Sequence, residues 1–275
     1  MLPRAPRLFA ATALAVVLAL AVAGCKTMDD ITGSTGARAA ASATPASPVA
    51  PRSEADWRKA LAVWGKRYRE NPGDIASAIA YARALRATDQ RAQAVAVLEQ
   101  ATMRHPTSMP LLGAYGRALA DSGQYVRALD ALGRAHTPDN PDWRILNAEG
   151  AVLDQMGRHN EAQRHYEAAL KIVPGEPSVL SNLALSYALT KDLARAERTL
   201  RQAAADPKAA PKVRQNLALV VGLEGRFDEA ERIASADLPP AEAEANISYL
   251  RTLLAQQHAR RREGKPLTLS PDAGT

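Results

Sequence analysis

The feature that most constrains this chain is an alanine that returns every 34 residues. Its positions are Ala94, Ala128, Ala162, Ala196 and Ala230, and one further step back along the chain reaches Ala60. The residue twelve positions before each of the five is small, and the residue four positions after it is mostly large. A fixed period of roughly 20 to 50 residues is the signature of repeat architectures, in which each unit buries its apolar face against its neighbours. The chain is therefore expected to fold as stacked copies of one small unit.

The two flanking columns explain how one unit would pack. The small column contains Ala82, Gly116, Gly150, Ala184 and Ala218, and the large column contains Leu98, Leu132, Tyr166, Leu200 and Ala234. Helix axes approach to about 8 Å only where small residues meet, and larger residues one turn away then fill the grooves beside the crossing. Gly123, Gly157 and Gly225 stand between the two halves of their units, where a residue with positive φ can end a helix. The pattern predicts a pair of antiparallel helices in every unit.

This pattern resembles the tetratricopeptide repeat, a helix pair of the same period with small residues at the crossing and a proline that ends the second helix. Prolines fall at or within one residue of the repeat boundaries, at Pro72, Pro106, Pro141, Pro174 and Pro207. The match is clearest over Trp143–Glu176. The resemblance implies an all-α, right-handed tetratricopeptide-repeat solenoid of about five repeats, with capping helices at both ends.

The same register divides the chain into segments. The repeats are expected to start at Ile75, Met109, Trp143, Pro177 and Pro211. The expected segments are a cleaved lipoprotein signal peptide (1–24), a lipidated cysteine with a flexible tether (25–53), an N-terminal capping half repeat (54–74), five repeats (75–240), a C-terminal capping helix (241–259) and a basic flexible tail (260–275). The tether is assigned because Ala, Ser, Thr, Gly and Pro dominate it, and such a composition cannot bury enough apolar surface to fold.

The start of the chain carries the signals of an exported lipoprotein. Arg4 and Arg7 precede the apolar run Leu8–Gly24, and Cys25 follows directly. A basic start, an apolar stretch and small residues before a cut are the parts of a signal peptide. Val-Ala-Gly before the cysteine resembles the bacterial lipobox, which implies acylation of Cys25 and firm membrane attachment, since each buried CH₂ adds about 0.8 kcal/mol. The alternative is an uncleaved transmembrane helix with an incidental cysteine, although this apolar run is short for a span of about 20 residues.

The cysteine and its neighbour also bear on location. Cys25 is the sole cysteine, so it has no partner within the chain for a disulfide or a thiolate metal site. By resemblance to bacterial lipoprotein sorting, Lys26 after the cysteine favours the outer membrane over the inner one. We therefore expect a lipid-anchored protein on the periplasmic face of the outer membrane.

The formal net charge of +6 is a weak guide to partners. Residues 1–24 contribute +2 and residues 260–265 contribute +3, so about +1 remains for everything between them. No basic stripe interleaved with aromatic residues accompanies the charge, as nucleic-acid binding would require. Nucleic acid is therefore not an expected partner.

Catalytic motifs are missing from the sequence. It contains no HExxH, no GxSxG and no Gly-rich phosphate loop. His159 shares a repeat column with Tyr125, Leu193 and Phe227, which favours a half-buried packing residue over a ligand. His165 lies six residues further on and so does not stack on the same helical face. We expect no enzyme activity, no metal, no cofactor and no small-molecule substrate. The alternative of an unrecognised enzyme has no sequence motif to support it.

The repeat architecture instead supplies a concave surface, formed by the first helices of successive units, onto which peptides or partner helices dock. The residues assigned to this groove by register are Arg83, Arg86, Gly113, Arg117, Asn147, Asp154, Ser181, Leu185, Gln215 and Leu219. One hypothesis is that Arg83, Arg86 and Arg117 bind an acidic or carboxylate-bearing peptide. The alternative is that these arginines are merely solvated residues of helix faces.

The C-terminal half also resembles the repeat-containing lipoproteins of tight-adherence (Tad, or Flp) pilus assembly systems. The matching residues are Val213–Leu219 (VRQNLAL), Gly225, Arg226, Phe227, Glu229–Glu231, Ala236–Pro239, Asn246, Tyr249–Arg251 and Ser178–Tyr187 (SVLSNLALSY). The resemblance implies a membrane-attached periplasmic scaffold that helps to assemble or localise the pilus secretion machine, with a secretin or other pilus assembly subunits as protein partners. The alternative function is a general periplasmic adaptor that recruits cell-wall or envelope enzymes.

Overall fold

The structure is a computed structural model that describes the backbone of residues 53–262, with side chains as far as Arg260. Expectations for the signal peptide, Cys25, the tether as far as residue 52 and residues 263–275 lie outside the described residues. The described part of the chain falls into two compact units, one that ends at Asn182 and one that begins at Leu183.

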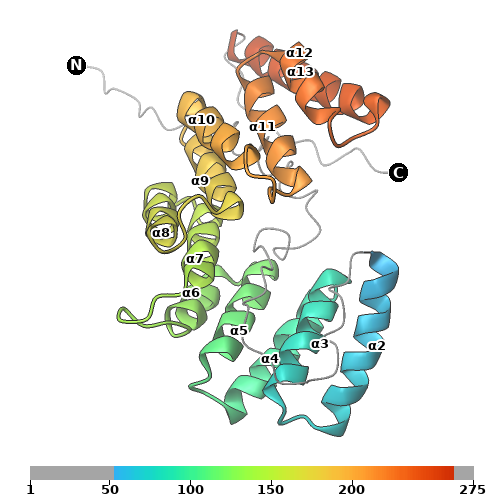
Figure 1. The fold of residues 1–275 in the computed structure, drawn as a ribbon, viewed down its shortest axis with the longest axis vertical. Coiled ribbons are helices and arrows are strands. Elements are labelled where there is room, and N and C mark those ends of the chain that lie inside the picture. Colours follow the sequence, from blue (N-terminus) through green and yellow to red (C-terminus); the bar gives the residue numbers. More distant parts are fainter. Residues whose placement is uncertain (1–52, 263–275) are drawn as a thin grey trace, which may run out of the picture. The chain divides into compact units, whose positions relative to one another are not determined.

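Twelve α-helices make up the described residues (Figure 1). They are α2 (Glu54–Glu70), α3 (Ile75–Ala87), α4 (Arg91–Arg104), α5 (Met109–Asp121), α6 (Tyr125–Gly133), α7 (Trp143–Gln155), α8 (His159–Ile172), α9 (Pro177–Leu189), α10 (Leu193–Ala204), α11 (Pro211–Leu223), α12 (Phe227–Ala234) and α13 (Pro240–Arg262). In the first unit each helix from α2 to α8 packs against the next, and in the second unit α10 to α13 do the same. The first helices of the pairs, α3, α5, α7, α9 and α11, start where the sequence places the repeat starts. The predicted all-α fold of tandem helix pairs is confirmed.

The turns inside the pairs show why glycine recurs there. Gly123, Gly157 and Gly225 have positive φ values of 76°, 75° and 86°. In the remaining two pairs the equivalent residues are Asp89, with φ 61°, and Lys191, with φ 69°. The left-handed conformation is easy for glycine but strained for a residue with a Cβ atom. All five pairs therefore turn in the same way, and two of them do so at a conformational cost.

The small columns mark the closest helix crossings. The periodic alanines Ala94, Ala128, Ala162, Ala196 and Ala230 all have no exposed surface. A Cβ atom added to Gly150 would lie 2.6 Å from Tyr166, and one added to Gly116 would lie 2.6 Å from Leu132. Both distances are far below van der Waals contact, so a larger residue at Gly116 or Gly150 would have to displace the facing side chain. Gly116, Gly150 and the five alanines thus lie where the helices pack most closely.

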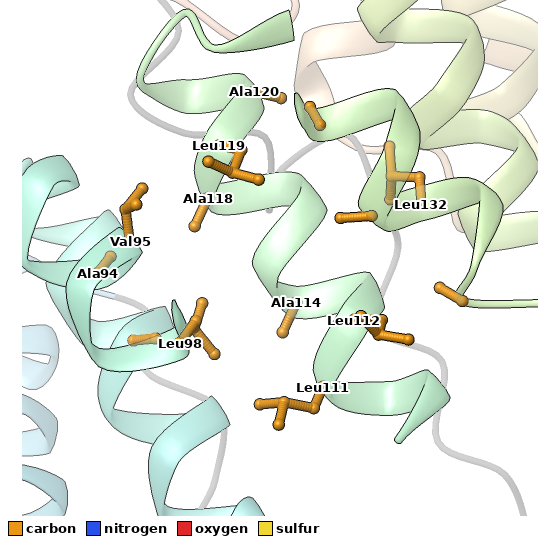
Figure 2. Packing of buried hydrophobic residues seen from close by; sticks show 14 of the residues in the cluster. Ala94, Val95, Leu98, Leu111, Leu112, Ala114, Ala118, Leu119, Ala120 and Leu132 are labelled. Atoms are coloured by element: carbon orange, nitrogen blue, oxygen red, sulfur yellow. The ribbon is translucent and has the colours of Figure 1, made fainter. Parts of the chain in front are cut away.

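One continuous hydrophobic core runs through the first unit, from Tyr68 to Val152. Figure 2 shows α5 within it: Leu111, Ala114 and Ala118 lie toward Leu98 of α4, while Leu132 of α6 lies on the other side of the helix. In this core each first helix is buried from two sides by second helices, which leaves its remaining face to form a surface.

The helix lengths depart from a uniform repeat at two places. Helix α6 ends early, at Gly133, and the loop after it contains an antiparallel bridge between Thr137 and Asn140. Helix α13 runs from Pro240 to Arg262, whereas the expected capping helix was 241–259 with a flexible tail from residue 260. The start of the predicted tail is thus helical. Pro240 does not interrupt this helix, because a proline at the first helical position removes no hydrogen bond.

Candidate functional site

Two arginines of the predicted groove keep part of their surface exposed in the first unit. Arg83 of α3 and Arg117 of α5 occupy the same column of consecutive first helices, and both side chains are half-buried. The guanidinium of Arg83 lies 5.4 Å from the centroid of the Trp57 ring, a cation–π distance. This contact holds the Arg83 side chain against α2 and leaves part of a basic surface along α3 and α5.

Arg86 corrects the expectation that three arginines line this surface. Its side chain is only 4% exposed, and its Nε lies 2.5 Å from Oδ2 of Asp121, which is 10% exposed. The two residues are 35 positions apart and link α3 to α5. A buried ion pair with an internal carboxylate satisfies the charge of Arg86, so that residue joins two repeats rather than meeting a ligand.

Asn147 lies beneath the surface rather than on it. It is 1% exposed, and its Oδ1 accepts a 2.9 Å hydrogen bond from Nδ2 of Asn182. Within the described residues its own Nδ2 donates to no acceptor. Ser181, the equivalent residue of the next repeat, is also buried, with 5% exposure. This column therefore combines buried polar groups with one unused amide donor.

Asp154 points into a different environment from the one expected. Its side chain is 9% exposed, and it accepts hydrogen bonds of 2.8 Å from Nδ1 of His159 and 3.0 Å from the hydroxyl of Tyr166. Burial, followed by the adjacent Asp154 carboxylate, raises the pKa of Tyr166 well above its usual value. Asp154 thus fixes α7 against α8, and His159 belongs to this packing cluster.

Gln215, in the second unit, is exposed on α11, and Leu219 one turn later is half-buried. The structure therefore presents Gln215 to solvent, while it buries Arg86, Asn147 and Ser181. Of the predicted groove residues, those with accessible side chains in the first unit are mainly Arg83 and Arg117.

Sequence reasoning missed a buried carboxylate in the third repeat. Glu149 of α7 is 7% exposed at the side chain, with His165 Nδ1 3.1 Å from its Oε2 and His136 Nε2 3.5 Å from its Oε1. The same repeat column contains Tyr81, Tyr115, Leu183 and Leu217. A charged residue in an otherwise apolar column was the available signal. The arrangement ties the α6–α7 loop, α7 and α8 together.

A second polar cluster joins three helices of the first unit. The hydroxyl of Tyr115 donates a 2.9 Å hydrogen bond to Oε1 of Glu99, and Nη2 of Arg127 lies 2.5 Å from the same oxygen. Burial, and then the hydrogen bond to Glu99, raises the pKa of Tyr115 to about 12. The hydrogen bonds from Tyr115 and Arg127 lower the pKa of Glu99. The cluster connects α4, α5 and α6.

Two further properties concern the part of the chain that the structure describes. No group of three or more His, Cys, Asp or Glu side chains in it could hold a metal ion. None of its helices is both long enough and apolar enough to cross a membrane.

Comparison with known proteins bears on the repeat itself. Residues 155–220 match the tetratricopeptide repeat family model. No curated protein matches the chain significantly in sequence.

Solved structures share the arrangement of helices at low sequence identity. The Cut9–Hcn1 structure of the APC/C hetero-tetramer has 13% identity and a TM-score of 0.61 over 74% of this chain, which spans 40% of that chain. PilW, described as a widely conserved type IV pilus biogenesis factor, has 18% identity and a TM-score of 0.60 over 73% of this chain and 91% of its own. PilF of Pseudomonas aeruginosa has 17% identity and a TM-score of 0.51 over 66% and 81%. With the periodic columns and the helix pairs, these likenesses show that the chain has an all-α tetratricopeptide-repeat fold.

Proposed function

We propose that this protein is an interaction scaffold that binds a protein partner along the first helices of its repeats. The observation that carries the proposal is a column of half-buried residues on consecutive first helices of the first unit: Arg83 on α3, Arg117 on α5 and Ala151 on α7. A ligand that lies along these helices would meet all three residues. The half-buried Arg83 and Arg117 offer guanidinium groups to acidic side chains of the same ligand.

The biological setting that we propose is assembly or localisation of a Tad/Flp pilus secretion machine, with a role toward the secretin like that of a pilotin. Two observations support it. Segments such as Val213–Leu219 resemble the repeat lipoproteins of those systems. The PilW structure, which shares the fold, is named as a type IV pilus biogenesis factor. The scaffold role needs no catalytic group, so we propose that the protein is not an enzyme.

We further propose that the scaffold is attached to the periplasmic face of the outer membrane through lipid on Cys25. The support is the order of basic residues, apolar run, Val-Ala-Gly and cysteine at the start of the chain. The Ala- and Ser-rich residues 26–53 would give the repeats reach from the membrane.

A photo-crosslinking experiment tests the partner. A photoreactive residue replaces half-buried Ala151 of α7, one repeat after Arg117 in the same column, and the full chain is expressed in its native bacterium. We expect adducts with the secretin or another pilus assembly subunit. The same residue in place of exposed Ala96, on second helix α4, is the matched control and should give none of these adducts.

Acidic substitution distinguishes two hypotheses: that the arginines bind an acidic ligand, and that they are merely solvated. Arg83→Glu with Arg117→Glu should remove the adducts at position 151, because like charges repel an acidic ligand. Adducts that persist unchanged would show that the two arginines are solvated and take no part. Recovery of cell-wall enzymes in place of pilus subunits would favour the general adaptor function.

A further inference from the structure

Helix α2 carries a face that is buried in the first four complete helix pairs. In those pairs the three residues of this face are at most 5% exposed: Ala94, Leu98 and Ala101 on α4; Ala128 and Leu132 on α6, with Ala135 just after it; Ala162, Tyr166 and Ala169 on α8; Ala196, Leu200 and Ala203 on α10. The corresponding α2 residues are Ala60 and Trp64, which are half-buried, and Arg67, which is exposed. Helix α2 is thus a second helix whose pairing face lacks a first helix within residues 53–262.

The opposite side of α2 packs against α3. Gly65 and Tyr68 are buried against α3, where the rings of Tyr68 and Tyr81 stack with centroids 5.7 Å apart. On the open side, the guanidinium of Arg67 covers the Trp64 ring at 4.8 Å. Val63, beside these residues, is 51% exposed. The open face therefore combines a large aromatic ring, an exposed valine and a movable cationic cover.

The sequence before α2 does not favour a first helix for this face. One period before α3, the matching segment would be residues 41–53, which contains Pro45, Pro48 and Pro51. Each proline in a helix interior costs about 3 kcal/mol or more. This composition disfavours a helix at that position, so a helix from another molecule is the candidate that completes the pair.

Helix α13 has the complementary property. It follows five complete pairs in the position of a first helix, and its Ala243, Ile247 and Leu250 are buried. Its other side bears a row of small exposed residues: Ala241, Ala245, Ser248 and Thr252. Within the described residues no second helix follows it. In the complete pairs, the first helix likewise presents small residues to the large side chain of the second, as Gly150 does to Tyr166.

We propose that copies of this protein associate head to tail, with the row of small residues on α13 of one copy packed against the Trp64 face of α2 in the next. Charge supports the antiparallel orientation of a repeat pair. Glu242 and Glu244 at the start of α13 would lie beside Lys66 and Arg67 at the end of α2. The row of small residues on α13 leaves room for the Trp64 ring, and formation of the contact removes water from that ring. Because the two surfaces differ, each copy keeps one free end, and the contact builds rows or rings rather than a closed dimer.

Engineered cysteines in the full chain, expressed in bacterial cells, test the contact. Ala60→Cys and Thr252→Cys lie opposite each other in the proposed interface, as Ala128 and Gly116 do in a complete pair, and the Cα atoms of a disulfide need a separation of about 4 to 7 Å. Under oxidising conditions the double variant should give dimers and larger multiples on a gel, which collapse to monomer on reduction. Each single variant should stay monomeric. Ala62→Cys with Thr252→Cys is the matched control, because exposed Ala62 lies on another side of α2.

A disrupting change completes the test. Ser248→Arg, at an exposed position on α13, places a long charged side chain in the interface without touching the core and should abolish the multiples. The unmodified chain, run on the same gel, shows whether Cys25 itself forms disulfide-linked multiples. The proposal is overturned if the double variant stays monomeric at normal protein level, if Ala60→Cys alone dimerises, or if the cysteines capture a different protein.

Discussion

At the scale of single residues, the helix crossings of the first four repeats place a small residue of the first helix against a large side chain of the second. Gly150 faces Tyr166, Gly116 faces Leu132, and in the first repeat Ala82 occupies the place of these glycines. We predict that Gly150→Ala lowers the free energy of unfolding by about 1–3 kcal/mol, since the added methyl has to displace the Tyr166 ring. Chemical denaturation of the two proteins measures the difference.

The other repeats also specify a rescue. Tyr166→Leu combined with Gly150→Ala recreates the alanine and leucine that the first and fourth repeats contain. It should recover part of the loss, because the clash is removed while the hydrogen bond from Tyr166 to Asp154 is lost. Gly133→Ala is the control, because its Cβ would meet only Glu149 at an ordinary 3.8 Å. A double variant no more stable than Gly150→Ala would show that Tyr166 is not the obstacle.

A second prediction concerns the turn at Lys191. This residue has a φ of 69° where three other repeats have glycine, so Lys191→Gly should relieve strain and raise the free energy of unfolding by about 0.5–1 kcal/mol. The reverse change, Gly157→Ala at the same place in another repeat, should lower it by a similar amount. Thermal melting of both variants checks the sign; an unstable Lys191→Gly protein would contradict it.

The residue scale also shows where sequence reasoning stops. The glycine turns could be predicted because glycine signals positive φ, whereas Asp89 and Lys191 could be found only by carrying the repeat period through them. Arg86 could not be assigned correctly, since its buried partner Asp121 lies 35 residues away and no local pattern links the two.

At the scale of helices, the hydrogen bond between Tyr115 and Glu99 joins α5 to α4. Tyr115→Phe should lower the free energy of unfolding by about 1 kcal/mol at neutral pH. The pKa of Tyr115 is raised to about 12 in the folded chain, against about 10 when unfolded. Between these values the folded chain keeps a proton that the unfolded chain releases, so Tyr115 makes stability fall as pH rises from 10 to 12.

Comparing the two proteins across that range isolates this residue from the other tyrosines. The stability of the Tyr115→Phe protein should fall less steeply between pH 10 and pH 12 than that of the unchanged protein. Tyr249→Phe serves as the control, because Tyr249 is 59% exposed and should behave like the unchanged chain. Parallel pH profiles for all three would contradict the role of Tyr115.

Helix lengths were less predictable than helix positions. The period sets where each pair begins, because the packing columns recur, but it does not set where a second helix ends. Helix α6 stops at Gly133, because glycine has a low helix propensity and a proline follows soon after, next to Thr137. Helix α13 continues to Arg262, because basic residues in a last helical turn suit the helix dipole and favour the helical state.

At the scale of the whole molecule, the fold could be predicted almost entirely, whereas the burial of the candidate groove residues could be predicted only in part. A solenoid is fixed by contacts between neighbouring repeats, which the columns record directly. The surface depends on which polar side chains find internal partners, as Arg86 and Asp154 do, and on faces left open at the ends. Trp64 could be placed on a second helix from the period, but its exposure became visible only in the structure.

The central proposal is a membrane-attached scaffold for pilus assembly, and the most direct test is Cys25→Ala in the native bacterium. We predict that this change releases the protein from the membrane fraction and abolishes pili together, while protein levels stay normal. Fractionation with immunoblotting measures attachment, and electron microscopy of the cell surface measures pili. Intact pili on cells whose Cys25→Ala protein is soluble and abundant would contradict the proposal.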